Sequence, residues 1–361
     1  MKLFKSLLVA PASLGLLAPM AATANEVTIN DFNAAEEIAV TNSRVDGLEA
    51  RINNFEAGSF SETTTASFSV DTVIGSIDGD TVSETTSFDY QFNIGLSTSF
   101  TGEDSLDIAI DNGNASQSPM AGVMGFDGGT ADSPLKVDGV TYTFPVGGAT
   151  MIVGDSTDLS TLFTGACTYS AFTDSTPDDC GTGNSLGVGG KGVTASLGYA
   201  FDSGFSLAGG ISSPQSEIVG DAADLFGIEA AYSADSYGVA VAYVSDDGGT
   251  GTDTTYWGLN GYYTFDLASL SVGFETSDDG TTEKDGYFVG LSFPEVGPGS
   301  VNIAAATTDL FADSETETLT YEASYSYDLN DGMSITPGIF IKEVDGADDE
   351  TGVAVKTSFS F

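Results

Sequence analysis

Residues 352–361 read GVAVKTSFSF, and side chains of two kinds alternate along this stretch. The odd-numbered positions carry branched or aromatic side chains, namely Val353, Val355, Thr357, Phe359 and Phe361. The even-numbered positions carry small or polar ones, namely Ala354, Lys356, Ser358 and Ser360. An apolar face opposite a polar face, ending on an aromatic, is typical of the closing strand of an outer-membrane β-barrel. Because an open sheet edge leaves backbone groups unpaired, we expect this strand to pair with the first strand of the sheet.

The composition of the chain supports a β-rich membrane protein. Its 361 residues include 45 glycines, 10 prolines and 11% aromatic residues. This mixture is too apolar for a disordered chain and too rich in glycine for a helical one. The long apolar run lies within residues 1–20, and no later stretch approaches the ~18 residues that a membrane helix needs. A membrane role would therefore depend on strands.

Residues 1–24 have the pattern of a secretory signal peptide. Lys2 and Lys5 precede an apolar segment, and Ala22-Thr23-Ala24 offers a small-residue cleavage site after Ala24. An ordinary N-terminal helix is the alternative interpretation. The whole chain has 9 Lys and Arg against 53 Asp and Glu, a formal net charge of -44. This charge excludes nucleic acid as a partner.

Residues 25–58 are expected to form a periplasmic linker followed by a helix. Apolar side chains recur there at heptad spacing, and those predicted to form a coiled-coil seam are Ile38, Val45, Leu48, Ile52 and Phe55. One interpretation is a trimeric coiled coil at the periplasmic end of the barrel. The other is a single amphipathic helix folded against the barrel mouth.

Residues 59–361 are predicted to form an all-β transmembrane barrel of about sixteen antiparallel strands, with fourteen or eighteen as alternatives. The strands are expected near Ala66–Ile74, Thr86–Phe100, Leu106–Asn112, Val140–Pro145, Ala149–Gly154, Gly192–Phe201, Phe205–Ile211, Leu225–Tyr232, Tyr237–Val244, Tyr256–Phe265, Leu270–Thr276, Tyr287–Phe293, Val301–Ala305, Leu319–Tyr327, Met333–Lys342 and Gly352–Phe361.

The connections between these strands alternate between long and short. The long ones are acidic and rich in glycine, whereas most of the others are tight turns. Outer-membrane barrels have long loops outside and short turns in the periplasm, so we expect a periplasmic N-terminus. Each even-numbered strand also ends on an outward aromatic residue, as a periplasmic aromatic girdle requires. These residues are Phe100, Phe144, Phe201, Tyr232, Phe265, Phe293, Tyr327 and Phe361.

The other strand face is predicted to line a water-filled pore. The charged and amide side chains assigned to it are Asp89, Gln91, Asn93, Asp107, Glu229, Asn260, Glu275, Asn302, Glu322, Lys342 and Lys356. Acids outnumber lysines in this set. Because charged side chains in a pore select ions by sign, we expect a preference for cations.

Little in the chain indicates an enzyme. It contains no histidine, which removes Ser-His-Asp and Cys-His nucleophiles and the common zinc ligand sets. We expect no cofactor and no dedicated metal site, only weak counter-ion binding by the acidic loops. Cys167 and Cys180 are the two cysteines, and in a secreted chain we expect them to form a disulfide within the third long loop. That bond either stiffens a constriction in the pore or only protects an exposed loop from proteolysis.

Several segments resemble the outer-membrane porins of cyanobacteria. These porins are often called iron-uptake porins and are related to the carbohydrate-selective porins. The segments that carry the resemblance are AVTNSRVDGLEARINNFEAGSFSETTTASF (39–68), SFTGEDSLDIAIDNGN (99–114), VTYTFPVGGATMIVGD (140–155), PGIFIK (337–342) and VKTSFSF (355–361).

The resemblance implies a homotrimeric diffusion channel, embedded in outer-membrane lipid, that passes small ions, inorganic iron included, and small solutes. The family usually carries an S-layer homology domain before the coiled coil, and residues 25–33 leave no room for one, so peptidoglycan anchoring is not predicted. A carbohydrate-selective porin is one alternative function. A structural barrel of the cell surface, plugged by its own loops, is the other.

Overall fold

The computed structural model describes residues 64–82, 84–114, 118–126, 134–174, 179–186, 192–218, 220, 223–249 and 251–361. The chain divides into two compact units, Met1–Ser61 and Glu62–Phe361, and everything described here belongs to the second. The expected signal peptide, linker and coiled-coil residues lie outside the described residues. No described helix is long and apolar enough to cross a membrane.

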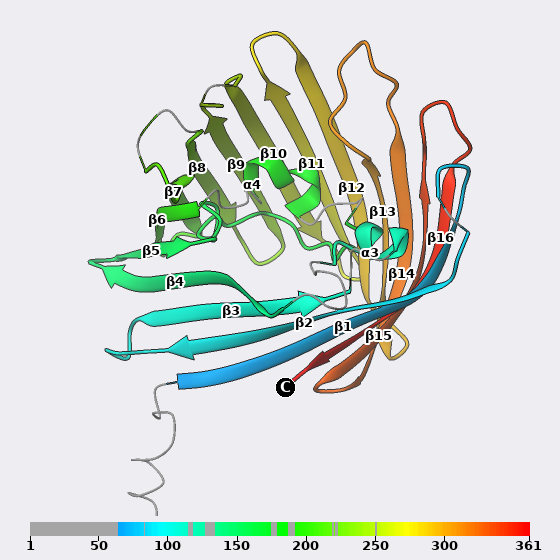
Figure 1. The fold of residues 1–361 in the computed structure, drawn as a ribbon, viewed down its shortest axis with the longest axis horizontal. Coiled ribbons are helices and arrows are strands. Elements are labelled where there is room, and N and C mark those ends of the chain that lie inside the picture. The colour runs from blue at the N-terminus through cyan, green and yellow to red at the C-terminus, as the bar shows by residue number, and fades with distance from the viewer. Residues whose placement is uncertain are drawn as a thin grey trace, which may run out of the picture. The chain divides into compact units, whose positions relative to one another are not determined.

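The second unit is a closed barrel of sixteen antiparallel strands, so the predicted fold class is confirmed. Each strand pairs with its neighbours in the sequence, and the first pairs with the last (Figure 1). The strands are β1 (Thr64–Asp78), β2 (Ser87–Thr98), β3 (Ser105–Gly113), β4 (Lys136–Val146), β5 (Ala149–Asp155), β6 (Gly192–Ala200), β7 (Phe205–Pro214), β8 (Leu225–Ser233), β9 (Tyr237–Asp246), β10 (Thr254–Thr264), β11 (Ser269–Asp278), β12 (Glu283–Val296), β13 (Gly299–Thr307), β14 (Leu319–Asn330), β15 (Met333–Lys342) and β16 (Glu350–Ser360).

Closure of the barrel depends on the stretch quoted first. β16 runs antiparallel to β1, with Val70 opposite Phe359 and Ile74 opposite Val355. Beyond the last ladder pair, the amides of Phe68 and Phe361 each donate to the other residue's carbonyl, at 2.8 and 3.0 Å. Their rings stack with centroids 5.6 Å apart. The sheet therefore has no free edge at this seam.

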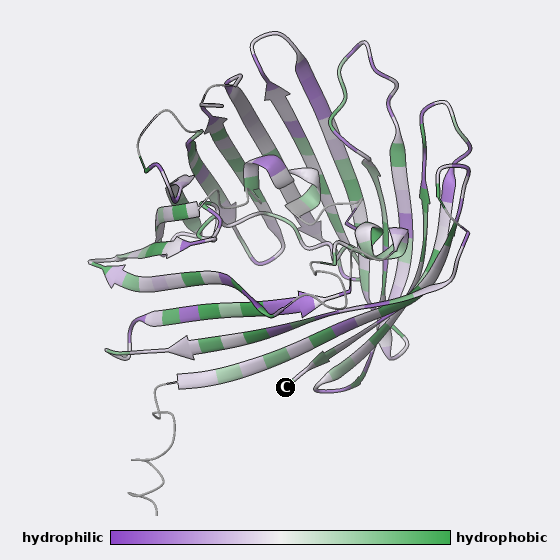
Figure 2. Ribbon diagram, in the orientation of Figure 1, coloured by the Kyte–Doolittle hydropathy of each residue, from purple (hydrophilic) through white to green (hydrophobic). Residues whose placement is uncertain are grey.

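The outer surface of the barrel is apolar. Hydrophobic residues alternate with other residues along the strands (Figure 2), and large apolar side chains such as Ile74, Trp257 and Ile339 are about half exposed, at 51%, 53% and 53%. On a soluble protein so much exposed apolar surface would favour aggregation, whereas in lipid it is favourable. The outward faces of the strands therefore suit contact with acyl chains.

The connections that follow even-numbered strands are short, and we call the rim they form the short-turn rim. It includes the turns at 202–204, 234–236 and 331–332, and we call the opposite rim the long-loop rim. Rings gather in pairs near the short-turn rim: Tyr199 with Phe201 at 4.6 Å, Tyr263 with Phe265 at 4.7 Å, and Phe205 with Tyr232 at 4.7 Å. These pairs include several of the aromatic residues predicted for the girdle.

Candidate functional site

The connection between β5 and β6 lies inside the barrel, and we call residues 156–191 the inner loop. Its described parts, 156–174 and 179–186, run along the inner surface of the wall, and Figure 1 shows α4 (Gly183–Leu186) within the ring of strands. Leu159 is fully buried against Leu225 of β8 and Val244 of β9. Further along, the ring of Tyr169 packs against Phe288 of β12, with centroids 5.1 Å apart. Apolar contacts thus hold the loop against the wall at several places.

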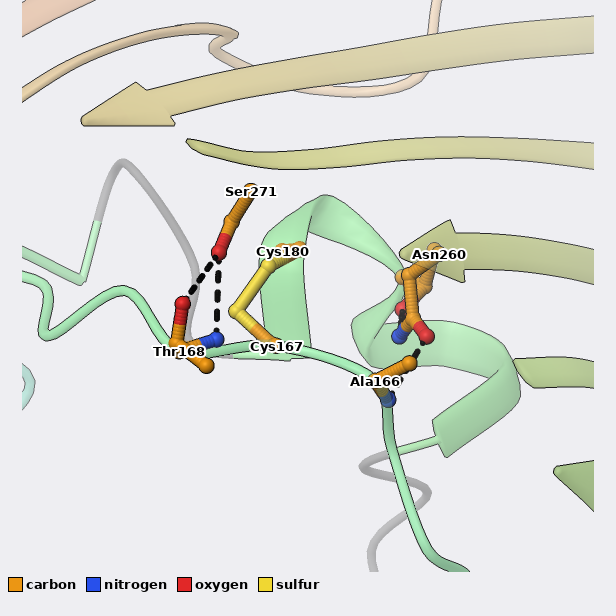
Figure 3. Close-up of a disulfide and its surroundings, with 7 residues drawn as sticks. Ala166, Cys167, Thr168, Cys180, Asn260 and Ser271 are labelled. Atoms are coloured by element: carbon orange, nitrogen blue, oxygen red, sulfur yellow. Dashed lines mark hydrogen bonds between the residues drawn. A yellow bond between two sulfur atoms is a disulfide. The ribbon is translucent and has the colours of Figure 1, made fainter. Parts of the chain in front are cut away.

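Polar side chains of the wall bind the backbone of the inner loop. The amide of Thr164 donates to Oε1 of Glu229 on β8 at 2.5 Å. The amide of Ala166 donates to Oδ1 of Asn260 on β10 at 2.9 Å, and that of Thr168 to Ser271 Oγ on β11 at 3.1 Å (Figure 3). From Thr164 to Thr168, every second loop residue therefore donates to a strand further around the barrel.

Glu322 on β14 is the most heavily bonded of these wall residues. Its carboxylate accepts hydrogen bonds from the Tyr169 hydroxyl and the Phe172 amide, both at 2.8 Å. It also accepts from the amide and hydroxyl of Thr173, at 2.8 and 2.7 Å. Burial, followed by the charge of Glu322, raises the pKa of Tyr169, so the phenol remains a donor at ordinary pH. Glu322 is only 3% exposed, and its charge is stabilised by these donors.

The loop returns through η3 (Asp179–Gly181) and α4, and Glu275 on β11 holds the returning part. Its carboxylate accepts from the Ser185 amide at 2.6 Å and from Asn184 Nδ2 at 2.9 Å. Cys167 and Cys180 form a disulfide between the outgoing and returning parts, with Cα atoms 5.7 Å apart (Figure 3). The predicted cysteine pair therefore lies inside the barrel.

Glycines on the inner wall make this close packing possible. A Cβ on Gly273 would lie 1.7 Å from the carbonyl oxygen of Cys180, and one on Gly258 would lie 1.9 Å from Ser185 Oγ. Any side chain at these two positions would displace the loop. Inward glycines in mid-strand are thus a sequence signal for a loop packed against the wall, although glycine is frequent throughout this chain.

A second long connection, between β3 and β4, also folds inward. It contains α3 (Pro119–Val123), whose N-cap Ser118 donates to Asp89 on β2 at 2.6 Å. Met120 is 2% exposed and belongs to an apolar cluster with wall residues of β1, β15 and β16. The Asp174 amide of the inner loop donates to the Val123 carbonyl at 2.8 Å. The two loops therefore meet and cover adjoining parts of the wall.

These loops correct part of the pore-lining prediction. Six of the residues assigned to the lumen are at most 6% exposed, and they are Asp89, Glu229, Asn260, Glu275, Asn302 and Glu322. Four of them, Glu229, Asn260, Glu275 and Glu322, bind the inner loop, and Asp89 binds the segment before α3. These side chains cannot line a water-filled pore because a folded loop lies over them or the wall buries them. Gln91, Asn93, Asp107, Lys342 and Lys356 are half-exposed or exposed.

The inner wall formed by β2 to β5 is only partly covered: Asp89 on β2 and Ile152 on β5 are buried, whereas other inward side chains are exposed. Asn93 on β2 lies on the same inner face as the buried Asp89, but it is exposed. Ala109 on β3 and Thr150 on β5 also lie on the inner face and are exposed. Asp107, between Ser97 and Thr141 of the neighbouring strands, is half-exposed and accepts from Ser105 Oγ at 2.7 Å. This stretch of wall therefore presents amide, hydroxyl and carboxylate groups to water.

The inner loop has a comparable surface. Its exposed side chains in the described part are hydroxyls, one amide and one carboxylate, namely Ser156, Thr161, Thr164, Thr168, Ser170, Asp174 and Asn184. Both surfaces lack arginine, because the two arginines of the sequence, Arg44 and Arg51, precede the described residues. Among the described residues there is also no cluster of three or more His, Cys, Asp or Glu that could hold a metal ion. The two facing surfaces are hydrophilic and carry acids.

Comparisons with known proteins agree with this architecture. The structure is similar to that of Pseudomonas putida OprB, with a TM-score of 0.63 and 13% identity over 83% of this chain and 94% of that one. It is also similar to an anion-selective porin from Comamonas acidovorans (TM-score 0.60, 15% identity, 82% and 99%) and to a porin variant from Rh. blastica (0.55, 16%, 82% and 100%). At these identities the likeness concerns the fold alone.

Two sequence comparisons go further. An uncharacterized protein of Nostoc sp. is 32% identical over an alignment of 160 residues, and the match covers 37% of this chain and only 28% of that relative's length. The family model described as "Gram-negative porin" matches residues 137–346, more than half of the chain. The chain therefore belongs to the family of Gram-negative porins, and its barrel is an outer-membrane barrel.

Proposed function

We propose that the protein forms a water-filled diffusion channel for small ions and small solutes, and that the channel prefers cations. The observation that carries this proposal is the uneven burial of the inner wall. Inward side chains such as Asn260, Glu275 and Glu322 are buried under the inner loop, whereas Asn93 and Thr150 on the opposite side are exposed. The water path then runs between the inner loop and β2 to β5.

The preference for cations follows from the charges along that path. Asp107 on the wall is half-exposed, Asp174 on the loop is exposed, and neither surface carries an arginine. The whole chain has a formal net charge of -44, which raises the local concentration of cations at both mouths. Inorganic iron enters this proposal as one hydrated cation among others.

The assembly we propose is a homotrimer with the short-turn rim and the N-terminus in the periplasm. The orientation is supported by the contrast between long and short connections, which matches the usual orientation of outer-membrane barrels. Residues 25–58 would then supply the coiled coil at the periplasmic end, as their heptad spacing predicts.

The loop-plugged structural barrel is the second candidate, and one observation favours it: two long loops fold into the lumen. The exposed inner surface of β2 to β5 favours the channel instead. Carbohydrate selectivity has less support, because sugar-binding pores would use arginine and aromatic side chains along the path.

Planar-bilayer recording in a KCl gradient tests the proposal. We expect stepwise insertion of open channels and a reversal potential that favours K⁺. Open channels without ion preference would agree with a diffusion channel but refute its preference for cations. A folded barrel that conducts no current would refute the channel and leave the plugged structural barrel.

The disulfide provides a separate prediction for the same recordings. The bond closes a loop that includes Tyr169 and Thr173, and a disulfide across a loop of this length is worth about 3 kcal/mol. We expect Cys167→Ser/Cys180→Ser to increase the fluctuations of the open current, because the outgoing and returning parts can then separate. Unchanged current fluctuations together with faster proteolysis of the variant would show that the bond only protects the loop.

A further inference from the structure

A preformed polar pocket of about 880 Å³ lies at the long-loop rim, and we call it the rim pocket. Residues of three connections line it, those between β1 and β2, β13 and β14, and β15 and β16. Phe311 and Asp285 exchange two backbone hydrogen bonds of 2.9 Å, which fold the β13–β14 connection back onto β12. The Leu319 amide donates to Glu343 at 2.9 Å on the other side. The walls of the pocket are therefore fixed by hydrogen bonds, and its volume is in the range of small-molecule sites.

The pocket contains an ammonium group that has no ionic partner in the described structure. Of its two lysines, Lys284 pairs with Glu315 at 3.3 Å. Lys342 lies opposite Glu350 in the ladder, but Glu350 accepts a hydrogen bond from the Thr81 hydroxyl. Among the described residues Lys342 makes no ion pair, and it is half-buried at the edge of the pocket. An incoming anionic group could therefore bind there without displacing a partner.

Carboxylates and apolar side chains complete the lining. Asp309 and Asp345 are exposed and lie in the two connections on either side. Leu310, Phe311 and Val344 add apolar surface. A simple anion would meet the repulsion of the carboxylates, and a simple cation would leave Lys342 unused. A small solute that carries both charges and a short apolar side chain could contact Lys342, the carboxylates and the apolar residues of the lining at the same time.

We propose that the rim pocket binds small zwitterions of the free amino acid class. The carboxylate of the solute binds Lys342, its ammonium group lies toward Asp309 and Asp345, and its side chain contacts Phe311. This proposal concerns binding at the rim and does not depend on conduction, so it can fail while the channel proposal holds, and the reverse.

Calorimetric titration of the detergent-solubilised full-length protein tests it, with L-leucine as the probe. Two analogues each lack one charge: 4-methylpentanoate has no ammonium and 3-methylbutylamine has no carboxylate. We expect leucine to bind, and each analogue to bind at least about tenfold more weakly, because one charge-assisted contact is lost. Equal affinities for the three compounds, or no leucine binding to the folded protein, would overturn the proposal.

Variants assign the binding to the rim pocket. Lys342→Met should weaken leucine binding to the level of 3-methylbutylamine, because it removes the partner of the carboxylate. Lys136→Met is the matched control, since Lys136 is an exposed lysine outside the pocket, and it should change nothing. Asp309→Asn/Asp345→Asn alters exposed loop positions and should reduce leucine to the level of 4-methylpentanoate. Leucine binding unchanged in both pocket variants would overturn the assignment.

Discussion

Replacing Glu322 with alanine is expected to release residues 169–173 of the inner loop from the wall and to raise the single-channel conductance. The variant removes four hydrogen bonds to Tyr169, Phe172 and Thr173, and bonds to a charged group contribute about 1.5–3 kcal/mol each. Their sum exceeds the about 5.5 kcal/mol that converts a 1:99 equilibrium to 99:1. Bilayer recording should therefore show a larger and noisier open state for Glu322→Ala than for the wild type.

Glu322→Gln is the matched variant, because its amide keeps one acceptor oxygen in nearly the same volume. It should give an intermediate conductance. Glu343→Ala is the control for loss of a carboxylate at the rim, since Glu343 bonds to Leu319 and Tyr321 and not to the inner loop. Wild-type conductance in a folded Glu322→Ala barrel would mean that the remaining hydrogen bonds, the disulfide and the apolar contacts hold the loop without Glu322.

Reversing the charge at Asp107 is expected to weaken or reverse the ion preference. Asp107→Lys places a cation on the partly covered wall, where Asp107 is half-exposed between Ser97 and Thr141. The Debye length is about 10 Å at 0.1 M salt and about 3 Å at 1 M, so the effect should be large in dilute KCl and small in concentrated KCl. The reversal potential in KCl gradients at both concentrations measures it.

Two further variants define the origin of that effect. Asp107→Asn should shift the reversal potential by about half as much as Asp107→Lys, because it changes the charge by one unit and not two. Asp266→Lys makes the same charge reversal in an exposed turn at the short-turn rim and should have little effect. An equal shift for Asp107→Lys and Asp266→Lys would show that the net charge, and not the path along β2 to β5, sets the selectivity.

Most of the barrel could be predicted because the physical signal is local. Two-residue alternation located every strand, including the weak ones near Val140–Gly154 and Val301–Ala305. Strand ends were less accurate: β12 begins at Glu283 and not near Tyr287. Backbone pairing continues there beyond the lipid-facing band, where the side chains are polar and the alternation disappears.

Membership in the porin family also confirms the expectation that the chain is not an enzyme.

Which inward residues are buried and which are exposed to water could not be predicted, because it depends on how the loops pack inside the barrel. Parity correctly places Glu229 and Glu322 on the inner face, but it cannot tell which inward side chains a loop will cover. Burial of a carboxylate is favourable only where donors meet it, and here the donors are backbone amides of residues about 65 to 150 positions away. The inward glycines Gly258 and Gly273 mark places where the inner loop packs closely against the wall. The sequence alone does not distinguish them from the many other glycines of the strands.

Cysteine accessibility tests the path between the inner loop and β2 to β5 most directly. The two cysteines of the chain are joined in a disulfide, so an introduced cysteine is the single reactive thiol. We predict that a water-soluble methanethiosulfonate reagent reduces the current of Asn93→Cys in steps and leaves Asn302→Cys unaffected. Modification of Asn302→Cys with an unchanged Asn93→Cys current would contradict the account, because the water path would then lie on the wall that the loops cover.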